Sequence, residues 1–260
     1  MNQEIKELKS ADLVRRGFTA DVYSWGPGRV IKLFHEPGPH ERVEREYRIT
    51  RAVHTAGLPA PAAYEIVTLG DRQGIVFERV AGVSMLTHFQ RTPWKMFHAI
   101  RQVADLQAQI LATPAPKQLP SLRERISAGI KRSCALSPAQ QKEAQDALAD
   151  LPDGEATCHG DFHPENILFT PRGPIVIDWG MTTRGDPFGD VACTSRLIRV
   201  AGLPSWTPAY MHQLLKCFRL LLHRSYIKRC LQHLGGTRDQ IERWAKPINA
   251  AATLWRVTWR

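Results

Sequence analysis

The sequence has little that would place this protein in a membrane or outside the cell. Its first residues, Met1–Lys9, are charged and contain no apolar segment of the signal-peptide type. No uninterrupted apolar run approaches the ~18 residues that a membrane-spanning helix requires. The five cysteines are an odd number, and no two are spaced as Cys-x-x-Cys, so neither a disulfide framework nor a zinc site is indicated. We therefore expect a cytoplasmic protein.

Internal repeats and low-complexity tracts are also absent. The 260 residues, 43% hydrophobic and 23% charged, are enough to bury a sizeable core as one large domain or two lobes. The net charge is +10, from 35 basic and 25 acidic residues. Such a charge is typical of a solvated basic surface, and it also permits weak association with nucleic acid.

Two polar stretches late in the chain stand beside short apolar runs. The first is His159-Gly-Asp-Phe-His-Pro-Glu-Asn166, and the second is Ile175-Val-Ile-Asp-Trp-Gly180. The β-prone runs Ile167–Phe169 and Ile175–Ile177 flank a turn at Thr170–Gly173, which predicts a hairpin.

Three side chains in these stretches are candidate ligands or bases. Asp161 and Asn166 share one loop, and Asp178 follows the second strand of the predicted hairpin. Carboxylate and amide oxygens are hard ligands that suit Mg²⁺. The three groups could hold the metal together, or two could hold it while one carboxylate serves as a base.

The spacing Asp161-x4-Asn166, followed by Asp178-x-Gly, is the arrangement of the catalytic and metal-binding loops of kinases. With His-Gly-Asp-x-His-Pro-x-Asn and Ile-Asp-Trp, it resembles the aminoglycoside phosphotransferase and choline kinase family of small-molecule kinases. The resemblance extends from about Val14 to Leu197. It implies an α+β, bilobal protein-kinase-like fold, in which a small five-stranded antiparallel lobe with one helix precedes a larger, mainly helical lobe. We expect these lobes at residues 1–80 and 81–260.

The first 80 residues follow the order that this fold requires. Alternating apolar residues and turns predict a helix at His40–Ala56 and strands at Leu13–Arg16, Asp21–Trp25, Arg29–Phe34, Ala63–Leu69 and Gly74–Val80. A phosphate-binding loop would lie between the first two strands, at Gly17–Ala20. It carries a single glycine, so by itself it is weak evidence.

The resemblance also implies where ATP binds. A lysine within an apolar strand usually points to solvent, but in kinases a strand lysine paired with a helix glutamate holds the nucleotide phosphates. Lys32 fits this role, and the family pattern favours Glu46 as its partner, with Glu44 as the alternative. The backbone of Glu78 and Val80 would bind the adenine ring.

The remaining roles follow from the same resemblance. Asn166 and Asp178 would hold Mg²⁺, and Asp161 would accept the proton of a small-molecule hydroxyl as it attacks ATP. His159 and His163 would shape the loop rather than act as acid or base. Asp190 is either a helix cap or a brace of the catalytic loop, and both interpretations are structural.

Beyond Pro93 the apolar spacing of three and four residues predicts helices. The clearest are Leu122–Ala135, Pro138–Leu151 with Ser137 as N-cap, Tyr210–Leu234 and Asp239–Leu254. Acidic residues are scarce at this end of the chain: Val191–Arg260 contains twelve lysines and arginines but only Asp239 and Glu242 as acids. Such a surface would repel a polycationic antibiotic, so we expect a neutral or anionic acceptor unless these side chains face away from the substrate.

Two other functions remain open on the sequence alone. One is a minimal protein kinase, although no Ala-Pro-Glu segment follows Asp178. The other is a non-catalytic protein of the same fold that binds nucleotide or nucleic acid. Against it, Lys32, Asp161, Asn166 and Asp178 are all present, whereas a decayed site typically loses at least one of them.

Overall fold

The structure is a computed structural model that describes residues 12–35, 40–90, 93–200 and 209–251. The chain divides into two compact units. Unit 1 comprises Met1–Val83 and Ile167–Gly180, and unit 2 comprises Ser84–Asn166 and Met181–Arg260. Unit 1 thus takes up a short segment from the second half of the sequence. Asp178 consequently belongs to unit 1, whereas Asp161 and Asn166 belong to unit 2.

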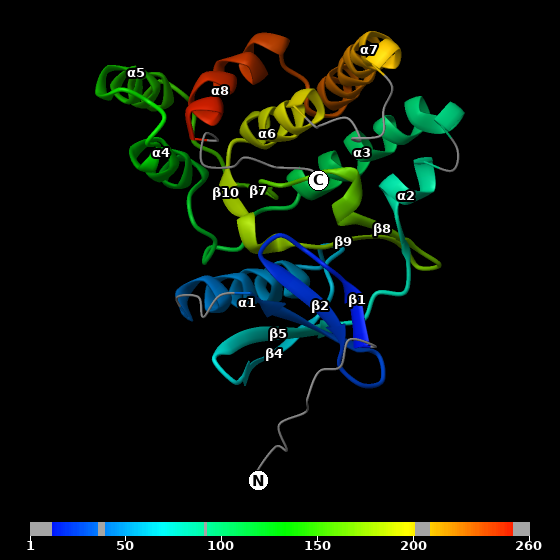
Figure 1. The fold of residues 1–260 in the computed structure, drawn as a ribbon. Coiled ribbons are helices and arrows are strands. Elements are labelled where there is room, and N and C mark those ends of the chain that lie inside the picture. The colour runs from blue at the N-terminus through cyan, green and yellow to red at the C-terminus, as the bar shows by residue number, and fades with distance from the viewer. Residues whose placement is uncertain (1–11, 36–39, 91–92, 201–208, 252–260) are drawn as a thin grey trace. The chain divides into compact units, whose positions relative to one another are not determined.

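Unit 1 is built on a five-stranded antiparallel sheet (Figure 1). The strands lie in the order β1-β2-β3-β5-β4, so β3 is at the centre, paired with β2 and β5. Their bounds are β1 (Leu13–Arg15), β2 (Ala20–Ser24), β3 (Arg29–Phe34), β4 (Ala63–Leu69) and β5 (Arg72–Glu78). All five predicted strands are confirmed to within two residues at either end.

Helix α1 (His40–Thr55) packs against β4 and β5. The sheet and helix share a core of small and large apolar side chains: Ala20, Phe34, Val43, Ala63, Ile75 and Phe77. The helix ends where Gly57 adopts a φ of 80°, a left-handed conformation that glycine accepts without steric cost. This helix is the one predicted from the sequence.

The predicted hairpin is formed by β8 (Ile167–Thr170) and β9 (Gly173–Val176), and β6 (Val83–Ser84) lies at the β8 edge. The chain then makes one 3-10 turn, η4 (Trp179–Met181). Trp179 is fully buried, and its indole N–H donates to the carbonyl of Val176 at 2.7 Å. This bond anchors the chain directly after Asp178.

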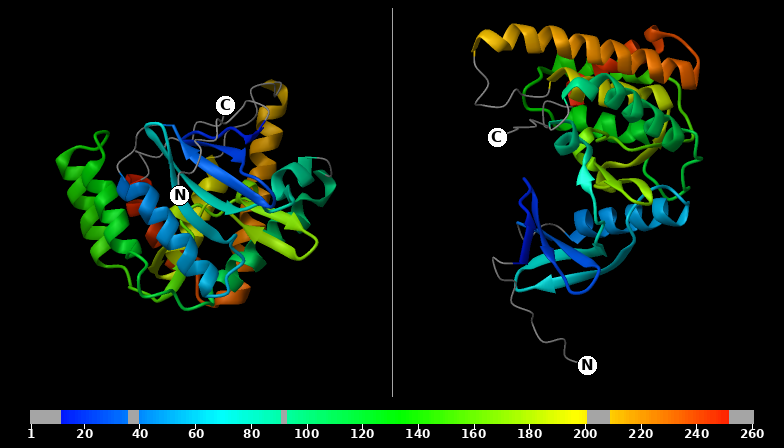
Figure 2. Two further views of the ribbon diagram at one scale, coloured as in Figure 1. Left: turned by 90° about the horizontal axis from the view of Figure 1, so that it is seen from below. Right: turned by 90° about the vertical axis from the view of Figure 1, so that its right-hand side faces the viewer.

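Unit 2 is mainly helical (Figure 2). Its α-helices are α2 (Met85–Gln90), α3 (Met96–Leu111), α4 (Leu122–Arg132), α5 (Pro138–Ala149), α6 (Pro187–Val200), α7 (Ala209–Leu234) and α8 (Arg238–Ala251). Short segments complete it: the 3-10 turns η2 (Pro93–Lys95) and η3 (Pro164–Asn166), and the antiparallel pair β7 (Ala156–Cys158) and β10 (Thr183–Gly185).

The helices of unit 2 pack as one connected set, in which α6 contacts both α7 and α8. Helix α3 packs against α7, and α8 packs against α4, α5 and α6. Helix α5 begins with a complete capping box, in which the Ser137 hydroxyl accepts from Gln140 N–H and the Gln140 side chain accepts from Ser137 N–H. The predicted cap at Ser137 is therefore confirmed. The last three residues of the predicted helix Asp239–Leu254 lie outside the described residues.

No helix among the described residues combines the length and the apolar character needed to cross a membrane.

Candidate active site

Lys32 lies on the central strand of unit 1 and is held between two carboxylates. Its Nζ lies 2.6 Å from Oε1 of Glu46 on α1 and 2.9 Å from Oδ1 of Asp178. The side chains of Lys32 and Glu46 are 17% and 7% exposed. The sequence left Glu44 and Glu46 open as partners of Lys32. Glu44 is exposed, so Glu46 is the partner.

The electrostatics of this cluster fix the charge of the lysine. Burial by itself would lower the pKa of Lys32, but the adjacent Asp178 and Glu46 outweigh it and raise the pKa above its ordinary value. Burial raises the pKa of Glu46, and the attraction of Lys32 opposes this effect. The result is a permanently protonated lysine beside two acids.

Two backbone features of the Asp178-Trp-Gly180 turn are unusual. Asp178 has a φ of 64°, and it is the one residue other than glycine with positive φ among those described. Side chains rarely adopt this conformation, and where they do the position is commonly functional. At Gly180 a Cβ would lie 2.8 Å from Oε2 of Glu46, so glycine leaves the space that the glutamate occupies.

In unit 2, Asp161 and Asn166 are joined within one loop. The Asn166 side-chain amide nitrogen donates to the Asp161 carbonyl at 3.0 Å and to its carboxylate at 3.3 Å. Both bonds use the nitrogen of the amide, so its oxygen is the atom suited to a metal. Asn166 is buried, whereas the Asp161 side chain is 32% exposed.

The residues before Asp161 shape this loop. His159 is fully buried, and its Nδ1 accepts a hydrogen bond from the Asp161 N–H at 3.2 Å. Gly160 has a φ of 78°, and a Cβ there would lie 2.6 Å from the Met181 carbonyl oxygen. His163 is on the other side, with Nε2 3.6 Å from the Asp161 carboxylate. These contacts agree with the structural roles expected of both histidines.

Asp190, at the start of α6, braces the loop. Its Oδ1 accepts from the Gly160 N–H at 2.7 Å, and its Oδ2 accepts from the Gln107 side chain at 2.8 Å. Gln107 on α3 also donates to Thr194 and accepts from the Tyr226 hydroxyl on α7. Asp190 was expected to be either a helix cap or a brace of the catalytic loop, and its contacts are those of the brace.

The remaining predicted nucleotide-binding residues lie in unit 1. The Glu78 N–H donates to the Ala62 carbonyl at 2.9 Å, so only its carbonyl could serve an adenine ring. Its carboxylate pairs with Arg172 at 2.8 Å, and this hydrogen bond lowers the pKa of Glu78. Val80 lies two residues beyond the end of β5. In the Gly17–Ala20 loop, the Gly17 N–H donates to Asp21 at 3.3 Å.

Comparison with known proteins identifies the family. The sequence profile of the phosphotransferase enzyme family matches residues 11–225. The chain belongs to this family. Among its relatives, an aminoglycoside 3'-phosphotransferase of Streptomyces fradiae is 28% identical over 185 residues, covering 63% of this chain and 68% of that protein. Acyl-CoA dehydrogenase family member 10 of Mus musculus is 29% identical over 181 residues, which are 60% of this chain and 17% of that protein.

The acyl-CoA dehydrogenase family members that match are much longer proteins, and this chain spans about a fifth of their length. Solved structures show the same kinase-like fold. The aminoglycoside-3'-phosphotransferase of type VIII superposes with a TM-score of 0.65 at 17% identity, over 94% of this chain and 93% of that one. The amicoumacin kinase hAmiN gives 0.63 at 11% identity, over 96% and 81%. The predicted fold class is confirmed.

Sequence reasoning missed two residues that support the candidate site. Gln107 is a polar side chain in the apolar stripe of α3, beside Val103, Leu106 and Ile110, and that position is the signal that could have revealed it. Arg125 on α4 donates to the Met181 carbonyl, which faces Gly160. No sequence pattern connects Arg125 with that loop.

Proposed function

We propose that this phosphotransferase moves the γ-phosphate of ATP to a hydroxyl of a small molecule, with Mg²⁺ as the metal. The observation that carries the proposal is the fixed ammonium group of Lys32, buried between Glu46 and Asp178. Phosphoryl transfer spreads negative charge over the transferred group, so the protein must supply positioned positive charge rather than covalent chemistry. A protonated lysine held by carboxylates is such a charge.

In this proposal Lys32 binds the α- and β-phosphates. Its bond to Glu46 holds it on the sheet, while the 2.9 Å contact with Asp178 gives way to phosphate oxygens. Hydrogen bonds from a charged donor to phosphate are stronger than those between neutral groups. The carbonyl of Glu78 and the backbone of Val80 would bind the adenine ring.

The residues also fit a divalent cation. Within the cluster of Lys32, Glu46 and Asp178, one lysine beside two carboxylates leaves an excess of one negative charge, and the Asp178 side chain is 43% exposed. Asp178 and the amide oxygen of Asn166 would hold Mg²⁺, since both offer the hard oxygen atoms that this ion prefers. When bound, the metal neutralises charge on the bridging phosphate oxygens.

Asp161 would accept the proton of the acceptor hydroxyl. As the hydroxyl oxygen forms its bond to the γ-phosphorus, the bond from that phosphorus to the bridging oxygen breaks and leaves ADP. The hydrogen bonds from Asn166 fix the carboxylate of Asp161 in one orientation. Removing the proton during attack typically accelerates such reactions by about 10²–10⁴-fold.

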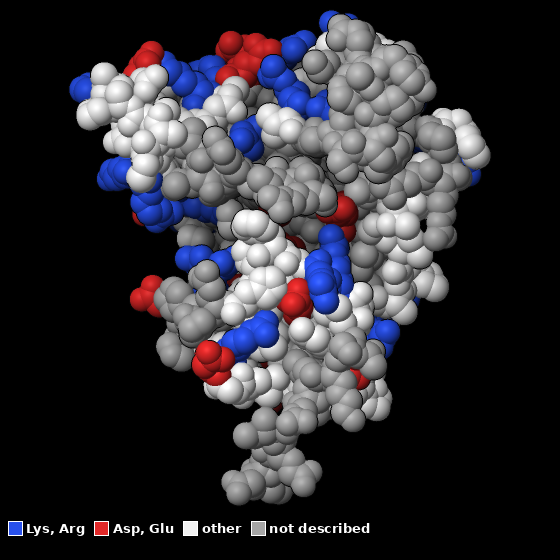
Figure 3. Space-filling model, viewed as in Figure 1, with Lys and Arg blue, Asp and Glu red and all other residues white. Residues whose placement is uncertain are grey.

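We propose a neutral or anionic acceptor. One related structure is a ternary complex of a phosphotransferase with ADP and hygromycin B, which is a precedent for small-molecule acceptors. In this chain, however, Lys and Arg side chains gather over α6 and α8 (Figure 3). A polycationic acceptor would meet net repulsion at such a surface. A cytoplasmic setting suits the described cysteines, which are free thiols.

An acceptor screen tests the proposal. ADP release from MgATP would be measured with aminoglycosides, sugars, sugar phosphates and hydroxy acids, with Asp161→Ala as the blank and Asp146→Ala as the matched control. We expect turnover with a neutral or anionic hydroxyl compound in the wild type and the control. Turnover only with aminoglycosides would overturn the acceptor class. Binding of ATP without turnover on any compound would favour the non-catalytic alternative.

A further inference from the structure

Three helices of unit 2 enclose a pocket rich in arginine. It has a volume of about 270 Å³ and is lined by side chains of α6, α7 and α8. Three of the lining residues are Arg196, Arg199 and Arg238, and the one acid among the described lining residues is Glu242. The pocket therefore has an excess of positive charge.

The arginines approach the pocket from two elements. Arg196 and Arg199 lie three residues apart on α6, which places them on one face of the helix. Arg238 begins α8, and its Nε lies 2.6 Å from Oε1 of Glu242. Neither α6 arginine has an acid within ion-pair distance among the residues that the structure describes. Two guanidinium groups thus have no carboxylate of this region to offset them.

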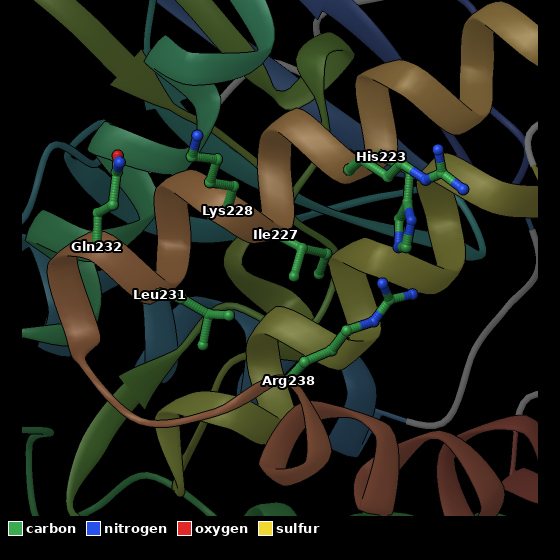
Figure 4. A pocket seen from close by; sticks show the side chains of 7 residues that line it. His223, Ile227, Lys228, Leu231, Gln232 and Arg238 are labelled. Atoms are coloured by element: carbon green, nitrogen blue, oxygen red, sulfur yellow. The ribbon is translucent and has the colours of Figure 1, made fainter.

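His223 of α7 adds polarity to the pocket but no charge. It is buried, and its Nε2 is 2.7 Å from the Ser195 hydroxyl. Burial, reinforced by Arg199 and Arg238 and opposed by Glu242, lowers the pKa of His223 to about 4. Figure 4 shows the Arg238 side chain extending from the start of α8 toward His223. The ring is neutral near pH 7, so the arginines alone determine the positive charge.

We propose that this pocket binds a small molecule through a phosphate or carboxylate group. A guanidinium presents a planar fork of donors that matches both groups. Burial lowers the pKa of Arg196, so this cation is already partly removed from water without a compensating anion. Ile227 and Ile241 provide an apolar wall for the carbon skeleton of the ligand. The volume is near the lower end of small-molecule sites.

The proposed anion site is distinct from the candidate catalytic groups. Helix α6 begins at the Asp190 brace and reaches Arg196 six residues later, about 9 Å along its axis. The pocket thus lies further along the helix that supports the catalytic loop. Anion binding to this pocket is measured without ATP, so its outcome is independent of whether the proposed kinase activity is correct.

Calorimetry on the full chain at pH 7 and constant ionic strength tests the site, with inorganic phosphate and succinate as probes in separate titrations. We expect saturable binding of at least one probe, and the tighter of the two identifies the preferred group. Arg196→Gln/Arg199→Gln should weaken it about tenfold or more. Lys228→Gln removes a cation of α7 that lines the neighbouring pocket drawn in Figure 4 but not the proposed anion site, and it should change affinity less than twofold.

A second readout locates the bound anion. The pKa of His223 would be measured from the NMR signals of its ring, with and without sulfate. Sulfate is chosen because it remains dianionic through the titration range of His223. Burial remains the largest cause of the low pKa, but an anion beside Arg199 and Arg238 offsets their repulsion of the protonated ring, so the pKa of His223 should rise part of the way from about 4. Binding of neither probe above a chloride background, or equal affinity in the double variant, would overturn the proposal. So would an unchanged His223 titration at saturating sulfate.

Discussion

The two groups of candidate catalytic residues are held in place by different forces. In unit 1, the ammonium group of Lys32 contacts the carboxylates of both Glu46 and Asp178 directly. In unit 2, Asp161 and Asn166 lie in a loop supported by backbone hydrogen bonds and by Gln107 through Asp190. One group depends on the attraction between opposite charges and the other on hydrogen-bond geometry.

This difference indicates different behaviour on ligand binding. A charge cluster rearranges when a new charge arrives, because each ion is stabilised only by the others. A loop fixed by backbone contacts keeps its geometry whether or not ligand is present. We infer that unit 1 responds to nucleotide, while the loop of unit 2 is preorganised for the hydroxyl group.

The largest effect is expected from Asp161→Asn. This change keeps the size of the side chain and an oxygen that can accept from Asn166, but it removes the base. Turnover should fall about 10³-fold, while the dissociation constant of ATP changes less than twofold. Steady-state ADP release and equilibrium nucleotide binding would measure the two quantities. Asp146→Asn, in an exposed ion pair with Lys142, is the control and should leave both unchanged. Wild-type turnover in Asp161→Asn would exclude the residue as a base.

The next largest effect is expected on the free energy of unfolding, from a change to the charge cluster of unit 1. Lys32→Met leaves the buried carboxylate of Glu46 and the partly exposed carboxylate of Asp178 without their cation. We expect the free energy of unfolding to fall by about 3 kcal/mol. ATP affinity should fall as well. Chemical denaturation compares the variant with Lys246→Met, which breaks a half-exposed pair with Glu143 and should cost less than about 1 kcal/mol. Equal losses in the two variants would contradict the importance of the buried charge.

A smaller effect should follow from Gln107→Leu in unit 2. The leucine fits an apolar helix face but removes the donor to Asp190 and the acceptor of Tyr226. We expect a loss of about 2 kcal/mol of stability, because buried polar groups lose their partners. Turnover should fall about tenfold with unchanged ATP affinity. Gln109→Leu on the exposed side of α3 is the control. A fall in ATP affinity instead would show that the brace acts on unit 1.

Much of unit 1 could be predicted from the sequence because its signals are local. Strand alternation and glycine turns predicted the sheet, and the resemblance to small-molecule kinases favoured Glu46 over Glu44 as the partner of Lys32, a pair that the structure contains. The loop of Asp161 and Asn166 was found in the same way, since five residues separate the two.

In unit 2, the brace was one of the two interpretations of Asp190, but the residues that support Asp190 could not be predicted. Gln107 and Asp190 are separated by 83 residues, and Tyr226 lies 119 residues from Gln107. Such partners meet only after the helices have packed, and no periodicity indicates which polar side chains will face each other. The positive φ of Asp178 was equally hidden, because the conformation depends on the anchored Trp179 beside it.

The smallest effect is expected from Gly180→Ala, which changes the charge cluster without removing any charge. The new methyl group would lie 2.8 Å from Oε2 of Glu46, at the end of a flexible side chain that can turn aside. We expect a stability loss of about 1 kcal/mol and a modest weakening of ATP binding, as Glu46 shifts relative to Lys32.

Gly160→Ala provides the matched change in unit 2. There the methyl group would lie 2.6 Å from a backbone oxygen, at a φ of 78°, and neither constraint can relax by a side-chain rotation. Its cost should therefore exceed that of Gly180→Ala, and it should reduce turnover more than ATP affinity. Thermal unfolding and nucleotide titration of both variants measure the contrast. If Gly180→Ala were the more damaging change, the charge cluster would be the rigid half of the site, and the preorganised loop would lose its place in the proposed mechanism.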